Sequence, residues 1–554
     1  MGNAKKKKTI KKPIEERYTL KNAVANWFLV AAFTVFPLWV NLTLNGSFPF
    51  LHFDDGFVGI RHQKYYFFLA IAALAVIAEI MLLVTKASSE KSEPNPKKQT
   101  LLQTISFTDW AAIALVLSCA ISTLFSEHLE MALFGETTVG SYTHGRNNGL
   151  LLILFYVAVY FMLTRCFRFK EYVFTAMAIT SCAVYMLAIL NGFFIDPLNM
   201  FGEFVNDETV FNNFMTTIGN KNMFASFICV TLPVIVTLFV HAKELWRRAV
   251  YLTAAAVGAM AAVVCDSDSV VLGIGVFAAV FLVVYARRPA SLKRYLLTLT
   301  VMLCSVKLLG LIAVWSGGNY KELGAIPSKI MLSPLSFAAL GVLAVITAAL
   351  YFFDSKRPET IFPKAVPIII GCVFGLAALG MLGTFIYFST VDVSSDLGDA
   401  ERLLRFSDSW GTHRGFMWNK AFEAFGGYNF FQKLFGTGPE TFYFSFSPYF
   451  GELWDRFGDT STDAAHNEYI NYLLNIGIVG LASYLTFTGS ALVRAFKSAK
   501  KKPMALVFAS AVVAYMAQAI VNIAVPIATP LFIIFVSLCE AVARQEKERE
   551  SQCA

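Results

Sequence analysis

One polar stretch near the carboxyl end of the chain holds residue types that could do chemistry. It runs from Asp463 to Leu481, DAAHNEYINYLLNIGIVGL, and places His466 directly before a long apolar run. A neutral imidazole, with an unperturbed pKa of about 6.5, is the side chain best suited to accept a proton from a hydroxyl at neutral pH. His466 is therefore the candidate general base. A histidine that only anchors a helix end at the membrane surface is the alternative.

Three amide side chains follow this histidine at a regular spacing. Asn467, Asn471 and Asn475 are four residues apart, which places them on one face of a helix. Polar groups on a membrane-spanning helix normally point to the interior of the bundle or to a water-filled cavity. We therefore expect Asn467 and Asn471 to line the site that contains His466.

The composition of the chain indicates that lipid is its solvent. Of 554 residues, 56% are hydrophobic and only 15% are charged, and the mean hydropathy is +0.58. Apolar runs long enough to cross a bilayer recur about 14 times. The predicted fold is an all-α polytopic membrane protein. The net charge of +8 reflects basic residues retained on the cytoplasmic side, so it does not indicate nucleic-acid binding.

The positions of Lys and Arg place both termini in the cytoplasm. A long extracytoplasmic segment precedes the third-last span, and its Arg414, Trp418, Phe422 and Phe425 recur at helical spacing, which predicts an amphipathic helix in a partly helical loop. The expected organisation is a basic tail at 1–22, a bundle of about 11 helices at 23–388, the loop at 389–467, C-terminal helices at 468–545 and a tail at 546–554.

Several short motifs together resemble the O-antigen ligase and polymerase superfamily of bacterial envelope glycosyltransferases. The run HNEYINYLLNIGIVGL is preceded by FGTGPETF and by RGFMW. GRNNGLL at 145–151 and IGNKNMFAS at 218–226 fit the same pattern. The resemblance is clearest over about 140–235 and 410–490 and implies a GT-C-like membrane fold.

The resemblance implies a reaction and its partners. The expected activity is transfer of a glycan from a polyprenyl diphosphate carrier, such as undecaprenyl diphosphate, to an acceptor hydroxyl on the outer face of the bacterial cytoplasmic membrane. The acceptor is a glycan, a lipid or a protein, membrane lipids surround the enzyme, and no metal or other cofactor is expected. A diphosphate is a good leaving group, so the protein must mainly bind its charge and deprotonate the acceptor.

The resemblance also implies roles for individual residues. His466 matches the family's histidine base, and Arg414 matches the family's loop arginine, whose planar guanidinium suits diphosphate oxygens. The glycines of FGTGPETF predict a tight turn, which either receives anions on its backbone N–H groups or has a purely structural purpose. The further candidates are Arg146 for diphosphate binding, and Asn220, Asn222, Gly436 and Gly438 as residues lining the site.

One turn departs from the family pattern. Many members carry a Ser-Arg-Gly turn in a mid-chain hairpin, where this chain reads CDSDSVVLG with Asp266 and Asp268. Lys307, isolated in the apolar run VMLCSVKLLGLIAV, could supply the missing positive charge to the diphosphate. Pairing with Asp266 or Asp268, or extension of its ammonium to the membrane surface, is the alternative.

Other functions remain open at this level. A transporter or flippase for a lipid-linked glycan is the alternative from another class, although no internal repeat of the kind common in transporters is visible. A protein O-oligosaccharyltransferase would share the histidine and the loop. A structural partner in an envelope assembly would keep the fold and lack the chemistry.

Overall fold

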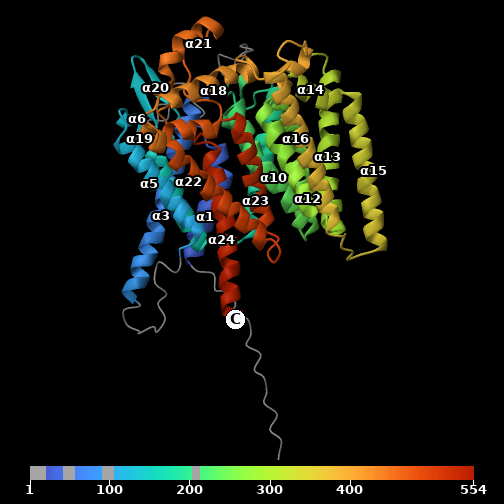
Figure 1. Cartoon of the computed structure of the whole chain (residues 1–554). Helices are drawn as coiled ribbons and strands as arrows, with labels where there is room; N and C mark the ends of the chain where they lie inside the picture. Colours follow the sequence, from blue (N-terminus) through green and yellow to red (C-terminus); the bar gives the residue numbers. More distant parts are fainter. Residues whose placement is uncertain (1–19, 41–56, 90–104, 202–211, 554) are drawn as a thin grey trace, which may run out of the picture.

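The computed structural model describes residues 20–40, 57–89, 105–201 and 212–553, so most of the expected basic tail at 1–22 lies outside the described residues. Within them the chain is a helical bundle (Figure 1). Eleven helices are long and apolar enough to cross a membrane, and Leu150–Cys166 and Ala505–Val521 are shorter apolar helices. The chain is thus a multi-pass membrane protein. The count of about 14 spans and the GT-C-like arrangement stay predictions.

The long helices follow the apolar runs of the sequence. They are α1 (Leu20–Val30), which continues through η1 (Ala31–Val35) and α2 (Phe36–Leu38), α3 (Phe57–Ser89), α5 (Phe107–Leu124), α7 (Leu150–Cys166), α8 (Glu171–Gly192), α10 (Lys221–His241), α11 (Leu245–Val264), α12 (Asp268–Tyr285), α13 (Pro289–Trp315), α15 (Pro334–Lys356), α16 (Ala365–Thr390), α22 (Glu468–Ser498), α23 (Ala505–Gln518) with η7 (Ala519–Val521), and α24 (Thr529–Cys553).

Short elements connect these helices. They are α6 (Leu129–Phe134), the hairpin strands β1 (Glu136–Val139) and β2 (Tyr142–Gly145), the strands β3 (Phe214–Met215) and β4 (Gly219–Asn220) around η4 (Thr216–Ile218), α14 (Ala325–Leu332), η5 (Gly398–Ala400), α17 (Glu401–Leu404), α18 (Trp410–Gly427), α19 (Phe430–Phe435), α20 (Phe442–Phe446), η6 (Ser447–Tyr449) and α21 (Phe450–Phe457).

The centre of the bundle is α10. Over the 18 most apolar consecutive residues of this helix, 94% are buried, and the helix packs against α11, α12, α13 and α23. By contrast α16 has no buried residue. Both kinds of helix are stable in a bilayer because lipid accepts apolar side chains that water would not. The functional residues must therefore be found near α10 and at the ends of the bundle.

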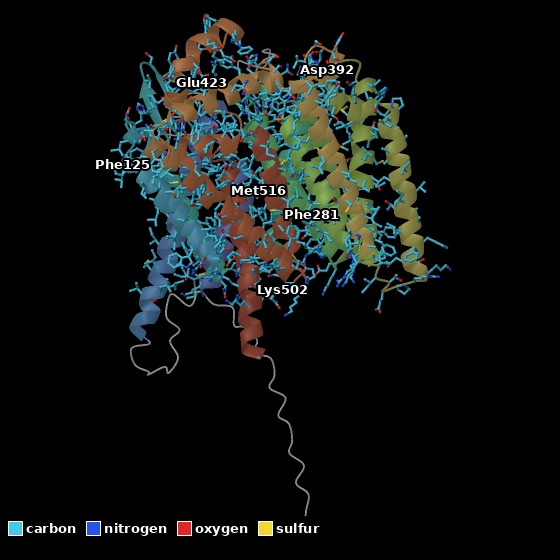
Figure 2. All side chains as sticks on the ribbon, viewed as in Figure 1. Phe125, Phe281, Asp392, Glu423, Lys502 and Met516 are labelled. Carbon is cyan, nitrogen blue, oxygen red and sulfur yellow. The ribbon has the colours of Figure 1, made fainter. Side chains whose placement is uncertain are left out.

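Residues 391–467 fold over one end of the bundle, which we call the loop end (Figure 1). Figure 2 places Glu423 and Asp392 at this end and Lys502 at the opposite end, which we call the tail end. The predicted amphipathic helix is α18, and it ends at Gly427. Its buried face is formed by Phe416, Met417 and Ala421, whereas Phe422 is exposed. The loop is thus a folded layer with its own apolar cluster.

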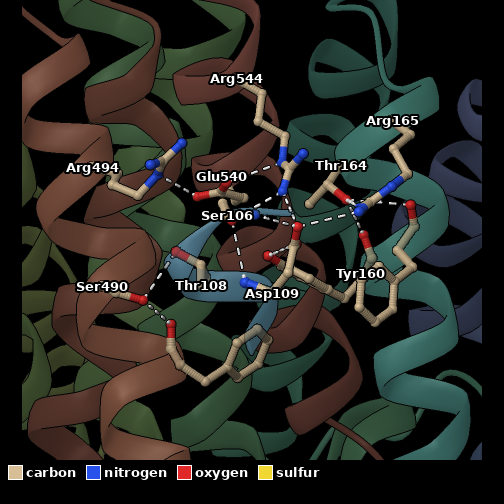
Figure 3. Close-up of polar contacts among 12 residues, drawn as sticks. Ser106, Thr108, Asp109, Tyr160, Thr164, Arg165, Ser490, Arg494, Glu540 and Arg544 are labelled. Carbon is tan, nitrogen blue, oxygen red and sulfur yellow. Dashed lines mark hydrogen bonds and ion pairs between the residues drawn. The ribbon is translucent and has the colours of Figure 1, made fainter. Parts of the chain in front are cut away.

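An ion network holds the tail end together (Figure 3). Asp109, at the start of α5, is fully buried, accepts a hydrogen bond from the Tyr160 hydroxyl at 2.7 Å, and pairs with both Arg165 and Arg544. Glu540, also fully buried, continues the network to Arg544 and to Arg494 of α22. The network therefore joins α5 and α7 to α22 and α24, two pairs of helices that lie hundreds of residues apart in the chain.

Candidate functional site

His466 lies in the backbone turn that leads into α22. Its φ angle is +50°, a left-handed conformation that is unusual for a residue other than glycine. The Asn467 side chain caps α22 by accepting from the N–H groups of Tyr469 and Ile470, and Asn471 accepts from the N–H of Ala465 at 2.7 Å. The two amides thus fix the backbone on both sides of His466. They hold the histidine in place and do not line the larger cavity described below.

A second structural feature lies further along α22. The helix is broken at Gly477, whose φ is +68°, and the carbonyl oxygens before the break need other donors. The N–H of Gly438 donates to the Asn475 carbonyl at 2.9 Å, and the N–H of Thr437 donates to that of Leu474 at 3.3 Å. The FGTGPETF turn therefore docks on the break in α22. Gly436 and Gly438 have this structural purpose, and they do not line the cavity that holds His466.

Replacing Gly436 with alanine should test this docking. A Cβ atom there would lie 2.2 Å from the Asn475 carbonyl oxygen, and φ is +76°. We expect Gly436→Ala to lower the free energy of unfolding by about 2 kcal/mol or more, measured by thermal unfolding in detergent. Gly426→Ala is the control, because a Cβ there meets nothing within 4 Å. Equal stability of both variants would show that the turn is not docked on α22.

A cavity of about 590 Å³ opens at the loop end. It brings together His466, Arg414, Arg146 and Asn222, four candidates that lie far apart in the sequence. Seven chain segments contribute: β2 with its link to α7, the residue before β3, the start of α10, the turn between α11 and α12, the start of α18, α21, and the segment before α22. Its further charged or titratable lining residues are His144, Lys221, Asp266, Asp268, His413, Asp459 and Asp463.

Burial and the neighbouring charges keep His466 neutral. Burial lowers the pKa of His466 to about 3, and the positive charges of Arg146 and Arg414 act in the same direction. The imidazole is therefore neutral at physiological pH, and its Nδ1 atom has no hydrogen-bond partner among the described residues. An anion bound to the two arginines would cancel their effect and raise the pKa of His466. The site thus has a free imidazole whose basicity increases when an anion binds.

Both arginines are held at the cavity wall. Arg414 follows three residues with left-handed backbone angles, Gly411 to His413, and burial lowers its pKa while the charge of Asp268 acts in the opposite direction. Nη1 of Arg146 is buried and lacks a hydrogen-bond partner among the described residues. Both guanidiniums remain charged at any physiological pH. The cavity is therefore suited to an anionic ligand.

The sequence comparison adds a family to this geometry. A family model described as O-antigen ligase matches residues 330–485, from the end of α14 through the first part of α22. This part of the chain is thus similar to the O-antigen ligase family, as its motifs predicted. No curated protein matches the sequence. The match contains Arg414 and His466, whereas Arg146 and Asn222 of this O-antigen ligase homologue lie outside it.

Two expected site residues of the O-antigen ligase homologue lie elsewhere. Asn220 caps α10 by accepting from the N–H of Asn222, whose own Oδ1 accepts from the Ser267 hydroxyl. Lys307 is buried between α13 and α14, and its ammonium donates to the Ile330 and Met331 carbonyls at the end of α14. The expected contact of Lys307 with the donor is therefore corrected to a helix cap, since its hydrogen bonds are used there.

The two carboxylates of the turn that departs from the family pattern interact with other parts of the protein. Oδ1 of Asp266 accepts the Gly324 N–H at 2.9 Å, and Asp268 is the carboxylate that acts on Arg414. Two more carboxylates at the cavity pair with histidines: Asp463 with His144, and Asp459 with His413. These carboxylates therefore have partners, and no group of three or more His, Cys, Asp or Glu in the described ranges could hold a metal ion.

A smaller polar cavity lies next to α22. It has a volume of about 20 Å³, room for about one water, and is lined by Asn471, Asn475, Glu440 and Glu468 among others. Glu468 accepts hydrogen bonds from the Tyr484 and Tyr515 hydroxyls, and Oδ1 of Asn475 lacks a partner among the described residues. Asn471 and Asn475 thus face a polar cavity in the bundle that is separate from that of His466, whereas Asn467 lines neither cavity.

Sequence reasoning missed two cations near the site. Lys221 lines the large cavity from the start of α10, between Asn220 and Asn222 of the IGNKNMFAS motif, which was a usable signal. Arg61 of α3 interacts electrostatically with Arg146 and Glu440. It follows a segment without any motif, so the sequence carried no sign of its position.

Proposed function

We propose that this O-antigen ligase homologue transfers a glycan from a polyprenyl diphosphate carrier to an acceptor hydroxyl, on the non-cytoplasmic face of the bacterial cytoplasmic membrane. The observation that supports it is the neutral imidazole of His466 beside Arg146 and Arg414 in one cavity. A base with a free lone pair next to two fixed positive charges suits a reaction that removes a proton and releases a diphosphate.

Each residue has a defined part in the proposed reaction. Arg146, Arg414 and Lys221 bind the diphosphate oxygens, and the bound anion raises the pKa of His466. His466 takes the proton of the acceptor hydroxyl, whose oxygen attacks the anomeric carbon of the glycan. The bond from that carbon to the diphosphate breaks, and the electron pair leaves with the polyprenyl diphosphate.

The location of the site supports the proposed side of the membrane. The loop end, which holds the cavity, would face outward, and both termini would lie in the cytoplasm. Arginines such as Arg165, Arg494 and Arg544 gather at the tail end, where the rule that basic residues stay inside places the cytoplasm (Figure 3).

The test uses purified protein in liposomes with a polyprenyl diphosphate glycan and a set of acceptors: lipid-linked sugars, polysaccharide and protein. Wild type should release polyprenyl diphosphate with one of these classes, and the productive class identifies ligase, polymerase or protein glycosylation. If the protein moved the lipid-linked glycan across the bilayer and released no polyprenyl diphosphate with any acceptor, the transferase activity would be contradicted and a flippase favoured.

Replacing Arg414 with alanine should weaken donor binding. A buried charge-assisted contact to the diphosphate would be lost, so we expect a loss of about 1–3 kcal/mol in donor binding free energy, measured by titration of the donor. Arg456→Ala is the control, because Arg456 is half-exposed in the same loop and pairs with Asp408 and Glu452. Unchanged donor affinity of Arg414→Ala would remove Arg414 from the site.

A further inference from the structure

Glu440 occupies a constrained position behind the cavity wall. It follows Pro439 in the turn that docks on the break in α22, and its φ is +65°. Only 6% of its surface is exposed. A non-glycine residue in a left-handed conformation persists where its surroundings hold it there. The place of the Glu440 carboxylate is therefore determined by the docked backbone and not by a mobile side chain.

The buried Glu440 carboxylate is hydrogen-bonded to the backbone of one arginine and feels the charges of two. It accepts a hydrogen bond from the backbone N–H of Arg146, and the charges of Arg146 and Arg61 both act on it. Arg61 and Arg146 also repel each other, because each guanidinium feels the other's positive charge. A buried carboxylate beside two like-charged groups reduces their repulsion and restrains their positions. Glu440 is thus the connection between the α22 break and Arg146.

We propose that Glu440 is a positioning residue that holds Arg146 in the cavity wall beside His466, in the geometry that receives the donor diphosphate. The inference rests on the proposed function and adds to it the group that sets the place of one diphosphate ligand. Glu440 does not line the cavity itself, so it acts through Arg146 and not on the substrate.

The titration of Glu440 makes this role visible. Burial raises the pKa of Glu440 to about 7, while Arg146 and Arg61 act in the opposite direction. The carboxylate is thus ionised at pH 8, where it restrains Arg146, and becomes neutral as the pH falls through 7. The charged or titratable groups that face it are Arg61 of α3, Arg146 of the link to α7, Asp463 of the segment before α22, and Glu468 and Tyr472 of α22.

The experiment measures binding of a C55 polyprenyl diphosphate that carries one N-acetylglucosamine, between pH 6 and pH 8. Both phosphates of this probe are doubly substituted, so its charge is constant over this range. At pH 8 we expect Glu440→Gln to bind the probe about tenfold more weakly than wild type. As the pH falls to 6, the difference in affinity between wild type and Glu440→Gln should disappear, because the carboxylate of the wild type becomes neutral. Any change in affinity that the two proteins share belongs to the histidines of the cavity, His144, His413 and His466.

Two further variants and two contradicting outcomes complete the test. Glu440→Asp keeps the carboxylate and should keep the pH dependence, with intermediate affinity. Glu423→Gln, exposed in the same loop, should behave as wild type. Equal or tighter binding by Glu440→Gln at pH 8 would show that the carboxylate only repels the anion, and would overturn its positioning role alone. A wild-type protein that does not bind the probe at any pH overturns the proposed function and this role together.

Discussion

Replacing His466 with alanine should abolish the release of polyprenyl diphosphate and leave the protein folded. The imidazole is the neutral group at the cavity that can accept the acceptor proton, and loss of a general base typically costs about 10²–10⁴-fold in rate. The measurement is single-turnover release of polyprenyl diphosphate in liposomes, with donor binding measured separately. Donor affinity should change little, because Arg146 and Arg414 remain.

Two variants separate the base from other roles of a histidine. His466→Gln keeps a polar side chain of similar length that cannot take up the proton, and should be as inactive as His466→Ala. His128→Ala is the control: His128 stacks on the Phe444 ring at the same end of the protein, with ring centroids 3.5 Å apart, and does not line the cavity. Retained release by His466→Ala would move the base to another residue.

Replacing Asp109 with alanine should strongly destabilise the bundle. The fully buried carboxylate is paired with Arg165 and Arg544 and accepts the Tyr160 hydroxyl (Figure 3). Its removal leaves two arginines side by side without the negative charge that offsets them. Removing one partner of a buried ion pair lowers protein stability by about 3–5 kcal/mol. We expect this loss in the free energy of unfolding, measured by denaturant titration in detergent.

The matched control is a salt bridge at the surface. Glu423, which pairs with Lys420, is largely exposed, so Glu423→Gln should change the stability by less than about 1 kcal/mol. Asp109→Asn keeps the size of the side chain, so a loss close to that of Asp109→Ala would assign the effect to charge and not to a cavity. A loss below about 1 kcal/mol in Asp109→Ala would show that the network does not hold the helices together.

The sequence alone determined the features that depend on local composition. The spans follow from apolar runs of membrane length, because a backbone in lipid must form helices wherever such a run occurs. The α18 helix lies where the helical spacing predicted it, and the loop precedes the third-last long helix, as the pattern predicted. His466, Arg414 and Arg146 were recognised from short motifs, and the structure brings them to one cavity.

Only the tertiary structure decided what each polar group contacts. The intramembrane Lys307 caps α14, and Lys64 likewise caps α2 through the Phe36 and Pro37 carbonyls, which no charge count could predict. The amides of Asn467 and Asn471 hold the backbone of His466 instead of lining its cavity. A polar group in lipid must find a partner, but its identity depends on which helix end lies nearby.

The remaining features depend on contacts between distant segments. Asp109 meets Arg544 across the tail end, and the Asn475 carbonyl at the break in α22 meets the hydroxyl of Ser122 and the N–H of Gly438. Glu440 meets Arg146 through the same docked turn. The type of one residue does not indicate such a partner, because the contact forms only when the folded chain brings both groups together.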